Sequence, residues 1–574
     1  MTAKIKIAGG VFAIALALIQ PASAQESQSF QDLVKSYYDA EFQAHPIAAT
    51  RVGIHDYDML VDDLSADGYA KNIARRQAAL RSISAIALNS LTDLERDDRE
   101  MLIGTIKGGL LDDETIQYWR HDPDRYSRAA TSAVFELVHR DFAPLADRLK
   151  SVIARERQIP AMLAAGKANI EHPPRAFVEI ALRNIEGSLN FYRHAAPTAF
   201  ASVQDPELKN GFATSNDAVI AALEDYKAFL TDLLPKADGS FALGSDVFIQ
   251  RLSDNEMLAA PVAKLREIAY GRLHQDQAAL KEAAHQVDPT KPVEAVLKKL
   301  RTQHPTAATL LKTARDDLAG LRAFVKDHDL VTIPSDLLPK VEETPGFSRA
   351  TTAAAMDSPG AFEQNATQAY YYVSPPDSGL SPDKLDQYLQ AYYFPALDII
   401  SAHEVWPGHF MQYLTRRSHP EWSLVRQLAH AQSTTEGWAH YAEQMMIEEG
   451  LGKDDPKLKV SQIEEALLRD CRFVASIEMH TDGKSVEDAT KIFMKECGSP
   501  EPEARREAYR GTSDPGYLNY TIGKLEILKL RDDYKARMGD KFSLKEFHDR
   551  FLAAGLAPVK IIRRELIGRD GSLL

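Results

Sequence analysis

Apolar residues recur at intervals of three and four over most of this chain, and this helical spacing constrains the fold more than any other feature. Helix-start signals accompany the periodic segments, for example Thr92 directly before "DLERDDREML". The sequence therefore predicts a mainly α fold. Four of the longest periodic segments are 30–45, 70–88, 261–287 and 461–480.

Strand signals are few. Residues 245–252 ("SDVFIQRL") and 369–376 ("AYYYVSPP") are rich in β-branched or aromatic side chains, which predicts two short strands. Two stretches rich in proline, glycine and serine, 332–346 and 374–383, predict loops. The sequence has no internal repeat, and its recognisable chemistry lies after residue 365.

Composition limits the function classes. The chain has 574 residues, of which 44% are hydrophobic and 26% charged, as in folded globular proteins. That length allows two to four core-sized units, or one large helical body with a cleft. The formal net charge of −14 argues against a nucleic-acid partner, because phosphate binding needs a basic surface.

The first residues predict a secretory signal peptide. Lys4 and Lys6 precede an apolar run at 7–19, and Ala22-Ser23-Ala24 forms a small-residue cleavage site after Ala24. The alternative is a membrane anchor, but spanning needs about 20 apolar residues, more than this run provides. No cysteine lies near the site, so a lipid anchor is not indicated. We expect a periplasmic or secreted protein that is not attached to a membrane after cleavage.

The chain contains two cysteines, Cys471 and Cys497. In an exported protein this pair would meet oxidising conditions and could form a disulfide. Two buried thiols are the alternative, and the sequence alone leaves both open.

The stretch "SAHEVWPGHFMQY" at 401–413 begins like the zinc-hydrolase signature H-E-x-x-H, but its second histidine comes six residues after the first. On a straight helix His403 and His409 would point about 240° apart and lie ~9 Å apart along the axis, too far to share an ion. Pro407 breaks the helical hydrogen bonding, and Gly408 allows unusual backbone conformations. A local unwinding or π-bulge of about two residues would return His409 to the side of His403.

Further carboxylates fit a metal site. Glu404 would be the general base for an activated water, and Glu436, 32 residues later in 433–446, would be the third ligand. Two imidazoles and one carboxylate with an open fourth position favour a single catalytic Zn²⁺. His440 and Glu443 would support the ligands or face the substrate. The alternative is an acidic helix face, next to two histidines at a helix end.

The segment 514–534 ("DPGYLNYTIGKLEILKLRDDY") adds two candidates. Tyr520, near a helix start, would aim its hydroxyl at a developing oxyanion. Arg531 would bind a substrate carboxylate with two hydrogen bonds. By spacing alone, structural roles for both residues are the commoner outcome.

These motifs together resemble a known family. "HEVWPGHFMQ" (403–412), "EGWAHYAE" (436–443) and "NYTIGKLEILKLR" (519–531) are similar to the pattern of the bacterial domain of unknown function 885, H-E-x-x-P-G-H-x-x-Q, E-G-W-A-x-Y-A-E and S-Y-x-I-G-x-L-x-I-x-x-L-R. The segments 51–65 and 174–192 also fit, so the resemblance covers the mature chain. This family is grouped with gluzincin-type metallopeptidases, which have helical bodies and deep clefts.

The resemblance implies that His403, His409 and Glu436 are the zinc ligands. It likewise implies that Glu404 is the base and that Tyr520 assists the oxyanion.

Other residues match the family less fully. Gln412 stands at the glutamine of the motif, and His480 stands at a family histidine. The D-T-G that usually precedes this histidine is replaced by "ASIEM", which weakens a site role for His480 and for Arg472. The strand at 369–376 would lie at a sheet edge along the zinc helix, where Tyr371 would line the cleft. An aromatic core strand is the alternative.

The implied architecture is a large helical zincin-like body with a deep substrate cleft and a few short strands beside the active-site helix. After the signal peptide at 1–24, a helical region at 25–365 would form part of the cleft. The catalytic region would occupy 366–574.

The leading hypothesis is an exported zinc peptidase that hydrolyses short or unfolded peptides. Two alternatives are a catalytically silent protein that binds metal or peptide, and a zinc hydrolase of a non-peptide ester or amide. The sequence does not determine the substrate preference, exo- or endo-action, or the oligomeric state.

Overall fold

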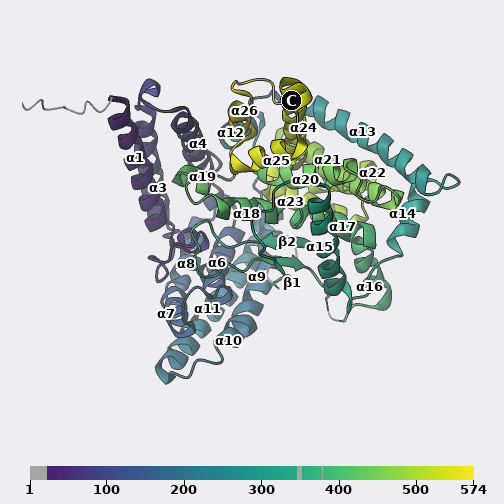
Figure 1. Cartoon of the computed structure of the whole chain (residues 1–574). Coiled ribbons are helices and arrows are strands. Elements are labelled where there is room, and N and C mark those ends of the chain that lie inside the picture. The colour runs from purple at the N-terminus through teal and green to yellow at the C-terminus, as the bar shows by residue number, and fades with distance from the viewer. Residues whose placement is uncertain (1–21, 346–348, 350–351, 378) are drawn as a thin grey trace, which may run out of the picture.

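The computed structural model of the chain describes residues 22–345, 349, 352–377 and 379–574 (Figure 1). The predicted signal peptide, 1–24, lies outside the described residues except for its last three positions. Within the described part of the chain, no helix is long and apolar enough to cross a membrane.

The fold is mainly α-helical, as the periodicity predicts. Thr92 caps α4 (Asp93–Leu110): its hydroxyl accepts the N–H of Glu95, whose carboxylate accepts the N–H of Thr92. The four long periodic segments correspond to α1 (Ala22–Ala44), α3 (Ala66–Ser84), α13 (Val262–Val287) and α21 (Pro456–Thr481).

The strand predicted at 245–252 is wrong, because this segment belongs to helix α12 (Ser245–Glu256). Phe248 and Leu252, four residues apart, are both buried in the same core, as the face of a helix requires. The short Val-Phe-Ile run imitates a strand, and only the packing around it distinguishes the two.

Three short strands form one sheet in the middle of the molecule (Figure 1). The strand predicted at 369–376 is confirmed as β3 (Tyr370–Val373). It lies between β1 (Lys340–Glu343), which is parallel to it, and β2 (Ala354–Asp357), which is antiparallel. The sequence missed β1, which falls within the predicted loop 332–346, and it missed β2.

One helical lobe lies at the lower left of Figure 1 and has its own core. Val134, Ile185 and Tyr226 are fully buried in it. Its helices are α5 (Tyr118–His121), α6 (Asp124–His139), α7 (Leu145–Glu156), α8 (Ile159–Asn169), α9 (Arg175–Asn190), α10 (Ala196–Ala199) and α11 (Pro206–Leu233).

A second core forms where α13 packs along α21. Here Cys471 and Cys497 form a disulfide, which decides between the two alternatives left open by the sequence. The bond links α21 to the residue that follows α22. Helices α12, α14 (Val293–Arg301), α22 (Val486–Glu496) and α23 (Glu501–Ser513) also contribute to this core.

The central core joins the two ends of the chain. Phe30 and Leu102 from the first helices share it with Trp438 and Ile562. Besides α1, α3, α4 and the sheet, this central body contains α2 (Pro46–Arg51), α15 (Leu310–Asp327), α16 (Pro382–Leu389), α17 (Phe394–Glu404), α18 (His409–Ser418), α19 (Leu424–Leu428), α20 (Gln432–Glu448), α24 (Asn519–Met538), α25 (Leu544–Ala553) and α26 (Val559–Ile567).

Candidate metal centre

The helix carrying the first histidine breaks where the sequence predicts. Helix α17 ends at Glu404 and α18 begins at His409, with an irregular segment, 405–408, between them. The break is longer than the expected unwinding of about two residues. The chain folds back on the end of α17, where the N–H of Gly408 donates to Ala402 O at 3.1 Å. The Trp406–Pro407 peptide bond in this segment is cis.

Gly408 is required by a close backbone approach. A Cβ built on it would lie 1.6 Å from His403 O and 2.6 Å from Ala402 O. Because both neighbours are backbone atoms, no side-chain rotation would relieve the overlap. Glycine therefore permits the reversal that carries His409 back beside His403.

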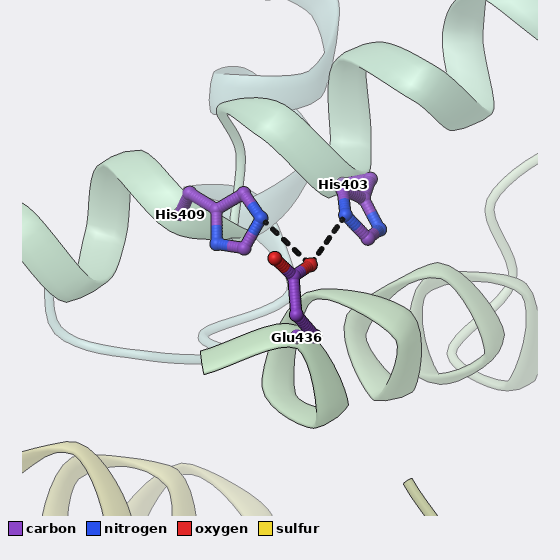
Figure 2. A group of neighbouring side chains, drawn as sticks. All are labelled: His403, His409 and Glu436. Carbon is purple, nitrogen blue, oxygen red and sulfur yellow. Dashed lines mark ion pairs between the residues drawn. The ribbon is translucent and has the colours of Figure 1, made fainter. Parts of the chain in front are cut away.

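His403, His409 and Glu436 converge, as predicted for a metal site (Figure 2). Glu436 Oε2 lies 3.6 Å from His403 Nε2 and 3.4 Å from His409 Nε2. A tetrahedral ion with bonds of about 2.1 Å separates its ligand atoms by roughly 3.4 Å. The measured separations therefore fit one zinc-sized ion bound by both rings and the carboxylate.

The other nitrogen of each histidine already has a partner. His403 Nδ1 donates to Glu443 Oε1 at 2.6 Å, and His409 Nδ1 donates to Gln412 Oε1 at 3.0 Å. The Gln412 amide nitrogen donates to two backbone carbonyls of α20, which fixes the direction of this amide. In the neutral form of each ring, Nε2 would therefore carry the lone pair, and both Nε2 atoms face Glu436.

The electrostatics of this group also call for a cation. Glu436 Oε2 is buried and has no hydrogen-bond partner. Burial raises the pKa of Glu436, but His409 and His403 hold that pKa well below its usual range. Burial lowers the pKa of His409, but the Glu436 carboxylate outweighs this and raises it to about 9. Positive charge is therefore favoured between these side chains, from protons or from a metal ion.

Glu404 lies beside this group and lines the same cavity. Its Oε2 accepts the backbone N–H of Met356 in β2 at 2.8 Å. The edge strand next to α17 is therefore β2, whereas the predicted edge strand, 369–376, contributes β3 at the middle of the sheet.

Tyr520 also reaches the site. Helices α20 and α24 cross closely, since a Cβ on Gly523 would meet Ser433 O at 1.8 Å. This contact brings the Tyr520 ring to 6.1 Å from the His403 ring. Its hydroxyl accepts a hydrogen bond from Arg510 at 3.3 Å. Burial raises the pKa of Tyr520, so the hydroxyl remains a proton donor at neutral pH.

A buried polar chain continues behind the ligands. Glu443 also accepts from His440 Nδ1 at 3.2 Å, and His440 Nε2 accepts from Lys524 at 3.3 Å. Burial lowers the pKa of His440 well below its usual value, and Lys524 adds to this effect. His440 and Glu443 therefore lie behind His403, where the sequence analysis placed residues that support the predicted ligands.

Three predicted site residues lie elsewhere. Tyr371 is fully buried, with its hydroxyl 3.1 Å from Ser401 Oγ, which agrees with the core-strand alternative. Arg531 pairs with Glu448 at 2.8 Å and does not line the cavity. His480 is fully buried and donates through Nε2 to Gly511 O at 2.8 Å.

His403, His409 and Glu436 face a cavity of about 870 Å³. Its walls are formed by α6 and α9, which belong to the helical lobe with its own core, and by β2, α21 and α23. Four arginines on α21 and α23 line it. The sequence analysis assigned Arg472 only a weakened site role and did not mark the other three. The spacing of these arginines along their helices was the available signal, but the sequence does not show which face of α21 or α23 lines the cavity. These arginines are Arg469, Arg472, Arg506 and Arg510.

Solved structures with this fold exist. A protein from Shewanella oneidensis, described as a "putative lipoprotein of unknown function", matches with a TM-score of 0.77 and 27% sequence identity, over 96% of this chain and 100% of its own. A "putative lipoprotein" from Colwellia psychrerythraea gives a TM-score of 0.80 over 95% of this chain and 99% of its own; its 18% identity shows the fold alone.

No curated protein sequence matches the chain. A family model described as "Bacterial protein of unknown function (DUF885)" matches residues 46–566. That range includes every residue of the metal group and nearly all of the three cores. The chain therefore belongs to the DUF885 family of bacterial proteins.

Proposed function

We propose that this protein is an exported zinc-dependent hydrolase that cuts short or unfolded peptides. The observation that carries the proposal is the buried Oε2 of Glu436, which accepts no hydrogen bond and lies 3.6 Å and 3.4 Å from the Nε2 atoms of His403 and His409. Two imidazoles and one carboxylate beside a cavity are the donor set of catalytic zinc. The carboxylate of Glu404, directly after the first ligand, is not needed for metal binding alone and favours an enzyme over a silent binder.

Each nearby residue has a definable part in hydrolysis. When bound, zinc would supply Lewis acidity that polarises the scissile carbonyl and lowers the pKa of water. Glu404, oriented by the Met356 N–H, would take a proton from the attacking water and return it to the leaving nitrogen. The Tyr520 hydroxyl would donate to the developing oxyanion. Glu443 and Gln412 would hold the two histidine rings in place.

The cavity supports a small substrate. Its volume of about 870 Å³ lies within the usual range of small-molecule sites and suits a peptide of a few residues. We also propose that the protein works outside the cytoplasm. Three features support this location: the predicted signal peptide, the disulfide, and the descriptions of the two structural neighbours as putative lipoproteins.

The test is mass-spectrometric analysis of a mixed short-peptide library incubated with the zinc-loaded mature protein. Glu404→Gln serves as the inactive variant. Glu449→Gln, an exposed change at the end of α20, serves as the matched control. We expect new peptide ends with the wild type and with Glu449→Gln but none with Glu404→Gln, and the product ends distinguish exo- from endo-action.

Two other results would redirect the proposal. Hydrolysis of ester or cell-wall amide substrates, without peptide cleavage, would keep the zinc chemistry and change the substrate class. Zinc binding without hydrolysis of any substrate would leave a metal- or peptide-binding protein.

A further inference from the structure

Among the described residues that line the cavity, the arginines differ in how firmly their guanidinium groups are held. Arg469 pairs with Glu465, Arg472 pairs with Glu507, and Arg510 pairs with Asp514. On the opposite wall Arg128 lies near two carboxylates and Arg183 stacks on a tyrosine ring. Arg506 differs. Burial acts to raise the pKa of Glu503 and Glu507 on the same helix, and the charge of Arg506 acts to lower it by favouring their ionised forms. Within the described part of the chain, however, Arg506 has no ion pair and no hydrogen bond, and it is exposed and lines the cavity.

Arg506 lines the same cavity as Tyr392 and as Ala353, the residue before β2. Burial raises the pKa of Tyr392 well above its usual value, and the nearby Arg506 guanidinium opposes this rise. The Tyr392 hydroxyl donates to Ala353 O at 2.9 Å, one residue before β2. Arg506 is thus near the start of the strand whose Met356 N–H binds Glu404.

From Met356, beside Glu404, strand β2 leads back to Ala353, on the side of Arg506. From Met356 back to Ala353 is three residues, which corresponds to roughly 10 Å in an extended strand. An extended peptide has the same rise per residue. A substrate lying along β2 with its scissile bond at Glu404 would therefore bring a group two or three residues away to the neighbourhood of Arg506.

We propose that Arg506 binds a carboxylate of the peptide substrate, two or three residues from the bond that is cut. This inference rests on the proposed peptidase function and gives Arg506 the role that the sequence assigned to Arg531. A planar guanidinium with free N–H groups binds a carboxylate through two charge-assisted hydrogen bonds. The carboxylate belongs to the free C-terminus of a short peptide or to an acidic side chain.

The experiment measures binding, so that it does not depend on cleavage. All proteins are full-length mature chains with Glu404→Gln, loaded with zinc, and calorimetry follows the titration. The probes are N-acetyl-trialanine, its C-terminal amide, and an N-acetyl tripeptide amide with a central glutamate. Arg506→Gln is the test variant. Arg505→Gln is the matched control, because Arg505 is next to it on α23, lies 3.8 Å from Glu487 and does not line the cavity.

We expect the parent and Arg505→Gln to bind the free acid about tenfold more tightly than the amide, and Arg506→Gln to lose this preference. If the glutamate-containing amide binds as tightly as the free acid and also depends on Arg506, the recognised carboxylate is an acidic side chain. Equal binding of acid and amide by the parent, a preference that survives in Arg506→Gln, or no binding of any probe would overturn the inference.

These outcomes separate the two proposals. A preference that depends on Arg506, in a protein whose wild type cleaves no peptide, would refute the peptidase function and leave the carboxylate site. Peptide cleavage by the wild type, with an unchanged preference for the free acid in Arg506→Gln, would support the peptidase function and refute the carboxylate site at Arg506.

Discussion

Replacing Gly408 by alanine should disable the proposed metal site, because the new methyl group would clash with backbone atoms of α17. The Cβ would lie 1.6 Å from His403 O, whereas ordinary contacts begin at 3.4 Å. Relief therefore needs a backbone shift of about 1.8 Å, the difference between these two distances. Zinc–ligand distances tolerate changes of only about 0.2 Å. His409, the next residue, would leave its position as a ligand.

We expect two measurable effects of Gly408→Ala. Zinc affinity, measured by competition with a chromophoric chelator, should fall at least about 100-fold, the upper end of what loss of a supporting contact costs. The free energy of unfolding without metal, measured by urea denaturation, should fall by about 1–3 kcal/mol because of overpacking.

Gly320→Ala is the control for this prediction. Gly320 lies within α15, and a Cβ there would meet no atom within 4 Å. Its replacement should therefore stabilise the helix by up to about 1 kcal/mol and leave zinc affinity unchanged. If Gly408→Ala bound zinc as tightly as the wild type, the argument that this close approach positions His409 would be refuted.

Three further predictions test separate parts of the structure. Gln412→Ala should weaken zinc binding about 10- to 100-fold by freeing the His409 ring, whereas Gln444→Ala, an exposed-side change on α20, should not; equal affinities would contradict the assigned hydrogen bond. Burial raises the pKa of Glu156 to about 8, so the folded state holds a proton that the unfolded state releases above about 4.5, and stability should fall as pH rises from about 5 to 8. At pH 7 the cost is roughly 3 kcal/mol, and Glu156→Gln should flatten the dependence of the melting temperature on pH; an unchanged slope would show that Glu156 is ionised. Replacing both Cys471 and Cys497 by serine opens a loop with a sequence separation of 26 and should cost about 3.5 kcal/mol in urea denaturation, while no loss would mean that the bond is not formed.

The sequence predicts that His403, His409 and Glu436 converge, and much of that reasoning rests on one short segment. The break at Pro407 and Gly408 could be deduced from the spacing of His403 and His409, since only a broken helix brings both to one ion. Helix periodicity likewise predicted the long amphipathic helices, whose pattern extends over many turns. The side chains predicted as ligands lie together, with Glu443 and Gln412 hydrogen-bonded to the two histidines.

Contacts between distant segments explain what the sequence missed. The N–H that binds Glu404 comes from Met356, and no strand pattern marked β2 because its Ala-Ala-Met-Asp sequence carries no alternation. Arg531 and Arg506 both lie on predicted helices, and the sequence does not distinguish them. In the structure Arg531 forms an ion pair with Glu448, whereas Arg506 lines the cavity. Which face of a helix meets a cavity depends on tertiary packing, which neither residue type nor spacing reveals.

The central claim is that His403, His409 and Glu436 hold one zinc ion. The most direct measurement is a crystal structure of the zinc-loaded protein with anomalous diffraction recorded on both sides of the zinc absorption edge. The account predicts a single anomalous peak about 2.1 Å from His403 Nε2, His409 Nε2 and a Glu436 oxygen. A peak elsewhere, or none at these side chains in zinc-saturated crystals, would contradict it.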